Sequence, residues 1–165
     1  MVSSGLSTVT VRTTWRAGAG ASIPIDVDLA ALLLNSAGRV RSDSDFVFFN
    51  NPQAADGAVK RFSDSGEEKL TMKLASLGAD VDAIAIVVTV YDGKGAFGDL
   101  SAARLTIDDS GLGRIVDFDL TEGLYDCRGA IYATIVRDGE RWILDAKAEY
   151  FPGLLEIAST YGVNV

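Results

Sequence analysis

The stretch IAIVVTVY, residues 84–91, is a continuous apolar run in which most side chains are β-branched. Such a run is typical of a strand that is buried on both of its faces. We therefore expect it to form the central strand of the fold, and the segments on either side indicate what kind of sheet surrounds it.

On the N-terminal side, the dominant period is two residues. STVTVRTTW, residues 7–15, and IPIDVDL, residues 23–29, alternate between two sets of side chains, as half-buried strands do. The apolar AALLLN that follows is ambiguous between strand and helix. Further strands are expected in VRSDSDFVFFNN, residues 40–51, and in LTMKLASL, residues 70–77, with a polar loop over about residues 50–68.

On the C-terminal side, two alternating segments, residues 103–107 and 114–120, flank the turn sequence DDSGLG. Residues 130–151 predict a long hairpin with Asp138 and Gly139 near its tip.

Only the end of the chain has a helical pattern. Pro152 suits a first helical turn, and Gly162 suits a helix stop. Many short strands with one late helix predict an all-β fold, an antiparallel β-sandwich with a short C-terminal helix, as a single domain over residues 1–165.

Composition excludes several classes of function. The chain carries 15 Lys and Arg against 23 Asp and Glu, a formal charge of -8, so nucleic acid is not expected as a partner. It has no His and one cysteine, Cys127, expected to be a small buried apolar residue; this removes histidine catalysis, zinc fingers and intrachain disulfides. No signal sequence or long apolar span is evident, so we expect a soluble cytoplasmic protein without direct membrane insertion.

The acidic residues suggest a metal site. Asp outnumbers Glu by 17 to 6, and Asp26 and Asp28 would share one face of a strand, as would Asp43 and Asp45. If the two pairs meet, their repulsion calls for a cation or for raised pKa values, and Ca²⁺ takes six to eight such oxygen ligands. The alternative is a solvated polar face, and the pattern leaves the two readings about equally favoured.

The run IDVDLAALLLNSAGRVRSDSDFVFFNN, residues 25–51, resembles the signature of the tellurium-resistance TerD family, and the segments ADVDAIAIVVTVYD, FGDLSAARL and YGVNV resemble that family in the same order. The resemblance implies a β-sandwich that binds calcium and serves in tellurite and chemical stress resistance without established catalysis. It supports Asp26, Asp28, Asp43 and Asp45 as metal-site residues, and Glu67 and Glu68 match the acidic loop that follows the signature.

Some acidic positions of that family are replaced here, among them by Arg16 and Gly66. The sequence therefore leaves three candidate functions. The first is a noncatalytic, calcium-binding stress protein that acts through protein partners, with self-association left open. The second is a structural subunit of a larger particle or envelope-associated assembly whose metal sites are degraded. The third, a hydrolytic enzyme, is disfavoured by the small size of the chain. The aromatic run Phe46, Phe48 and Phe49 is expected to be core packing.

Overall fold

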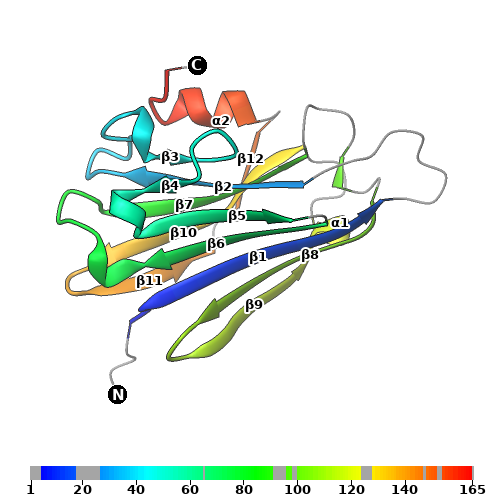
Figure 1. Ribbon diagram of the computed structural model, residues 1–165, viewed down its shortest axis with the longest axis horizontal. Helices are drawn as coiled ribbons and strands as arrows, with labels where there is room; N and C mark the ends of the chain where they lie inside the picture. Colours follow the sequence, from blue (N-terminus) through cyan, green and yellow to red (C-terminus); the bar gives the residue numbers. More distant parts are fainter. Residues whose placement is uncertain are drawn as a thin grey trace.

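Two antiparallel sheets lie face to face, with a short helix against the outer side of one of them (Figure 1). The structure is a computed structural model, and it describes residues 5–17, 27–64, 66–90, 96–97, 100–123, 128–146, 148–151 and 154–164.

The first sheet, called the β1 sheet, has the strand order β4-β5-β6-β1-β8-β9. Its strands are β1 (Thr8–Ala17), β4 (Gln53–Ala54), β5 (Val59–Asp64), β6 (Glu67–Lys73), β8 (Leu100–Asp109) and β9 (Gly113–Asp119). Its described strand pairs are all antiparallel, and Val11 of β1 lies between Leu70 of β6 and Ile107 of β8.

The second sheet, called the β7 sheet, has the order β11-β10-β7-β2-β3, and β12 also pairs with β10. Its strands are β2 (Val27–Leu34), β3 (Phe46–Val47), β7 (Ala83–Val90), β10 (Gly129–Asp138), β11 (Arg141–Asp145) and β12 (Glu149–Phe151). The helical elements are α1 (Leu120–Gly123), α2 (Leu154–Thr160) and the 3₁₀ turns η1 (Asp43–Asp45), η2 (Ala55–Gly57) and η3 (Leu74–Ser76).

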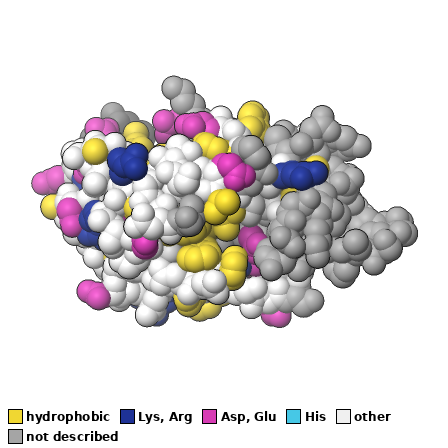
Figure 2. All heavy atoms as spheres, turned by 90° about the horizontal axis from the view of Figure 1, so that it is seen from above, with side chains coloured by type: hydrophobic (Ala, Val, Ile, Leu, Met, Phe, Trp, Pro, Cys, Tyr) yellow, Lys and Arg dark blue, Asp and Glu magenta, His cyan; other side chains and the backbone are white. Residues whose placement is uncertain are grey.

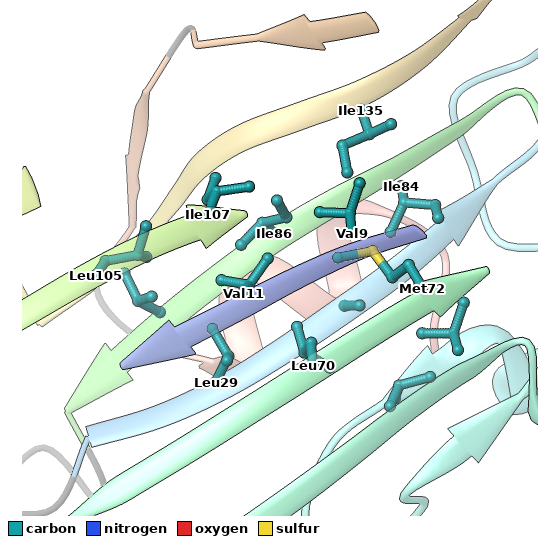
Figure 3. Close-up of a cluster of buried hydrophobic side chains, with 14 of the residues drawn as sticks. Val9, Val11, Leu29, Leu70, Met72, Ile84, Ile86, Leu105, Ile107 and Ile135 are labelled. Atoms are coloured by element: carbon teal, nitrogen blue, oxygen red, sulfur yellow. The ribbon is translucent and has the colours of Figure 1, made fainter. Parts of the chain in front are cut away.

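The main core fills the space between the two sheets. Val11 and Leu70 of the β1 sheet meet Leu29 and Ile86 of the β7 sheet, and all four side chains are fully buried (Figure 3). Because side chains alternate along residues 7–15, one of the two sets of β1 side chains points into this core, as expected of a half-buried strand.

A second, smaller core lies on the other face of the β7 sheet. There Leu32 of β2 and Val87 of β7 pack with Ile157 and Ala158 of α2. The strands β2 and β7 are thus buried on both faces, which explains the uninterrupted apolar runs in their sequences.

The sequence predicts most of this architecture correctly. The sandwich, the central strand, the hairpin of residues 130–151 and the C-terminal helix are confirmed, and Gly162 ends the helix with a φ of 94°. Pro152 lies outside the described residues.

Three local predictions are wrong. The strand expected over residues 70–77 ends at Lys73, because η3 occupies Leu74–Ser76. Most of residues 40–51 is not a strand, because η1 occupies Asp43–Asp45 and only Phe46–Val47 pairs with β2. The predicted polar loop contains β4 and β5 instead, because Val59 and its neighbours pair with β6 and Val59 is buried in the core.

The cover that α2 provides can be tested by removing one buried side chain. Ile157→Ala should lower the free energy of unfolding by about 2 to 4 kcal/mol, because it leaves a cavity against β2 and β7. Leu155→Ala on the same helix is the control, because Leu155 is 61% exposed and its loss should cost about 0.5 kcal/mol or less. Urea unfolding measures both, and equal losses would contradict the second core.

Candidate functional site

A buried cluster of charged side chains lies where β5 and β6 of the β1 sheet approach β2 of the β7 sheet. Arg61 of β5 and Glu68 of β6 both point inward, and the Arg61 Nη2 lies 2.6 Å from the Glu68 Oε2. Their side chains are only 7% and 5% exposed. Asp28 of β2 contributes a second carboxylate, 3.6 Å from the same Arg61 nitrogen and 13% exposed. We call these three residues the Arg61 cluster.

The Arg61 cluster joins the two sheets through the backbone of Leu29. The Leu29 N–H donates to the Glu68 Oε1 at 2.7 Å, and the Arg61 Nε donates to the Leu29 carbonyl oxygen at 2.9 Å. Strand β3 pairs Val47 with Ala31 of β2 and ends there. If β3 continued in the same register, Phe49 would lie opposite Leu29 and would bond to its backbone. In its place, the side chains of Arg61 and Glu68 from the β1 sheet make these bonds to Leu29.

Burial raises the pKa of the Glu68 carboxyl to about 7, and the charge of Asp28 adds to this rise. The Leu29 N–H and the Arg61 guanidinium favour the ionised form and oppose it. One guanidinium cannot balance two carboxylates, so protonating Glu68 leaves Arg61 and Asp28 as a neutral pair.

The second acidic segment forms a separate cluster. Asp45 is buried and accepts two hydrogen bonds from the Arg41 side chain, from Nε and Nη2, each of 2.8 Å, and one of 3.0 Å from the Arg41 N–H. The remaining Arg41 nitrogen, Nη1, donates to Asp80 at 2.7 Å. The two carboxylates hold the pKa of Arg41 above its usual value.

The other predicted site residues also lie apart. Because η1 is not a strand, Asp43 does not share a face with Asp45; it is exposed and accepts a bond of 3.0 Å from the Asn164 N–H. Glu67 points to the opposite face of β6 from Glu68, where it pairs with Arg12 at 2.7 Å.

The structure therefore does not bring Asp28 and Asp45 together. Phe46, next to Asp45, pairs with Leu32, and Leu32 lies four residues from Asp28, about 13 Å along β2. Asp26 lies outside the described residues.

As arranged, these carboxylates do not fit a calcium site. Among the residues that the structure describes, no group of three or more acidic, His or Cys side chains could hold a metal ion. The Glu68 and Asp28 carboxylates share Arg61, and Asp45 is engaged by Arg41. Calcium binding by this chain stays a prediction.

Sequence reasoning missed both arginines. The inward direction of Arg61 could have been predicted, because Arg61 lies two residues after the buried Val59 and therefore on the same face of β5. The residue that Arg61 contacts could not be read from the sequence, because Glu68 and Asp28 come from two other strands.

An apolar groove of about 330 Å³ lies between η1, the β3 segment and α2. Its walls come from the aromatic run and the helix: Phe46, Phe48, Phe49, Leu154, Leu155, Ala158 and Val163, with Asp43 and Asn164 at its rim. The Phe46 and Phe48 rings stack with centroids 4.3 Å apart. Phe46 is buried as expected, but Phe49 is 47% exposed, so the prediction of pure core packing is wrong for it. The face that carries α2 shows hydrophobic side chains gathered near its middle (Figure 2).

The fold and these sites define an antiparallel β-sandwich with paired internal charges and an exposed apolar groove. The TerD domain matches residues 2–161 of the chain. The tellurium resistance protein TerD of Serratia marcescens is 33% identical over 163 residues, covering 91% of this chain and 84% of the relative. General stress protein 16U of Bacillus subtilis (strain 168) is 28% identical over 152 residues, covering 85% of this chain and 79% of the relative.

A solved structure with the same fold is the crystal structure of a homologue of the telluride resistance protein TerD from Streptomyces coelicolor A3(2). It superposes with a TM-score of 0.79 at 20% identity, covering 94% of this chain and 96% of that one. The chain belongs to the TerD family of tellurium-resistance and stress proteins.

The family assignment agrees with the sequence resemblance. Among the described helices, none is long and apolar enough to cross a membrane.

The Arg61 cluster predicts an unusual dependence of stability on pH. Because the pKa of Glu68 is raised in the folded state to about 7, the stability that Glu68 contributes is present at low pH and is lost as pH rises through that value. The melting temperature should fall by several degrees between pH 5 and pH 8, and Glu68→Gln should flatten this slope.

Glu67→Gln is the matched control, because Glu67 is the neighbouring residue and its pair with Arg12 is exposed. It should leave the slope unchanged. Thermal unfolding followed by circular dichroism at each pH makes the measurement. A wild-type stability that increases over this pH range would contradict the assignment.

Proposed function

We propose that this chain is a noncatalytic stress protein of the TerD type that protects the cell against tellurite by docking a protein partner. The observation that supports this proposal best is the apolar groove beside α2. Its lining is mostly hydrophobic, with Asp43 as the one charged residue among the described lining residues, and Phe49 and Leu155 are exposed. Exposed apolar surface that is concave and bordered by polar residues is typical of an interaction site.

The occupant that suits this groove is a short apolar segment of a protein partner. The stacked Phe46 and Phe48 rings form a rigid wall, so little side-chain entropy is lost when a partner binds. Acid–base catalysis is disfavoured by the state of the buried carboxylates, since Glu68 and Asp45 are each paired with an arginine.

The proposal predicts that Phe49 is needed for protection. Phe49→Ser should reduce tellurite survival in a host that lacks its own copy toward the level of the empty vector. Its melting temperature should change little, because substitutions of exposed side chains usually alter stability by about 0.5 kcal/mol or less. The measurement is colony survival on tellurite, with melting temperature determined on the purified variant.

Phe62→Ser is the matched control. Phe62 is also a phenylalanine with 47% of its surface exposed, but it lies on β5 of the other sheet, where the Lys69 ammonium lies over its ring. It should retain full protection. If both variants protected fully, or if both lost protection, docking in the groove would be contradicted.

A structural role in a larger assembly is a second candidate, and one observation favours it. Three of the acidic residues expected to bind calcium, Asp28, Glu68 and Asp45, are paired with Arg61 or Arg41, as they would be in a sandwich whose metal sites are degraded. This role requires that the chain sediment with a large complex and that deleting it leave tellurite survival unchanged, whereas the leading proposal requires a loss of survival.

A further inference from the structure

The Arg61 cluster already contains a positive charge. A buried guanidinium is costly unless its charge and its N–H groups are matched, and Arg61 is 7% exposed. Its nitrogens reach a carboxylate oxygen of Glu68 at 2.6 Å and the carbonyl oxygen of Leu29 at 2.9 Å, with an oxygen of Asp28 at 3.6 Å.

These neighbours are the oxygen donors that a hard cation takes, namely two carboxylates and a backbone carbonyl. One more polar atom belongs to the same region. Thr13 of β1 pairs directly with Glu68 in the register of β1 and β6, is fully buried, and its hydroxyl has no hydrogen-bond partner among the described residues. The Arg61 guanidinium therefore stands among oxygens that would otherwise suit a metal ion.

We propose that Arg61 is a built-in cation, which takes the place of calcium at the Asp28–Glu68 carboxylates and lets this end of the sandwich close without a metal. A guanidinium keeps its charge at every physiological pH, so one positive charge is always present beside these carboxylates. A calcium ion could enter only by displacing Arg61 from Glu68 and Leu29, and the two positive charges would then repel each other in a buried space.

The second acidic cluster uses the same solution independently. Arg41 holds Asp45 through two side-chain bonds of 2.8 Å and reaches Asp80 with its remaining nitrogen at 2.7 Å. Asp28, Glu68 and Asp45 were all expected near calcium, and each of their carboxylates is instead paired with an arginine.

The experiment is to remove the Arg61 charge and measure what calcium then does. Arg61→Met keeps an unbranched side chain but leaves Glu68 and Asp28 without their counter-ion. We compare the melting temperatures of metal-stripped protein with and without calcium. At calcium about a hundredfold above its dissociation constant, Arg61→Met should gain about 5 to 10 °C more than the wild type does.

Arg12→Met is the matched control. It removes an arginine paired with the adjacent glutamate, Glu67, at 2.7 Å, but on the exposed face of the sheet. Its calcium shift should equal that of the wild type. Calcium that binds elsewhere on the chain shifts all variants alike and cancels in this comparison.

The double variant Arg61→Met/Glu68→Gln tests where calcium acts. It should lose the additional shift, because one carboxylate of the revealed site is gone. The proposal is overturned if Arg61→Met gains no more from calcium than Arg12→Met, or if the double variant keeps the full gain.

A second measurement decides the matter if Arg61→Met does not fold. Calorimetric titration of calcium into wild type and Asp28→Asn should give the same binding, because Asp28 faces Arg61 rather than a metal. A loss of calcium binding in Asp28→Asn would overturn the proposal, and equal binding would support it.

Discussion

The closing of this sandwich depends on the bonds that Glu68 and Arg61 make to the two backbone groups of Leu29. The strand β3 ends two residues before it could pair there, so the N–H and carbonyl of Leu29 would be buried without partners, at a cost of about 1 to 3 kcal/mol for each group. Side chains of β5 and β6 make those bonds instead. Because they belong to the other sheet, the same contacts also hold the two sheets in register at this end.

The rest of the fold follows from burial on two faces. The strands β2 and β7 contribute side chains both to the core between the sheets and to the smaller core under α2. Each of these strands therefore needs an apolar layer packed against both of its faces. The β1 sheet provides one cover and Ile157 of the short C-terminal helix provides the centre of the other. A polar outward face on β2 or β7 would have left α2 without a surface to pack on, which is why residues 29–34 of β2 and the β7 strand show no alternation.

The sequence is informative wherever a period of two residues decides which side chains enter the core, as in residues 7–15 and in the hairpin around Asp138 and Gly139. It misleads where spacing alone was used to place charges. Asp43 and Asp45 are two residues apart, but a 3₁₀ turn sends only Asp45 inward. The role of Arg61 depends on contacts with two other strands, and no local pattern specifies them.

A set of buried carboxylates requires positive charge, but its spacing does not say whether a metal or an arginine supplies it. In this chain the choice affects the groove as well. Arg41 grips Asp45 within η1, and η1 leads directly into Phe46 and the aromatic wall of the groove. Because Arg41 holds that turn, the shape of the groove depends on a permanent charge of the chain. If the groove docks an apolar partner as proposed, that surface would not have to form and dissolve with the supply of a bound ion.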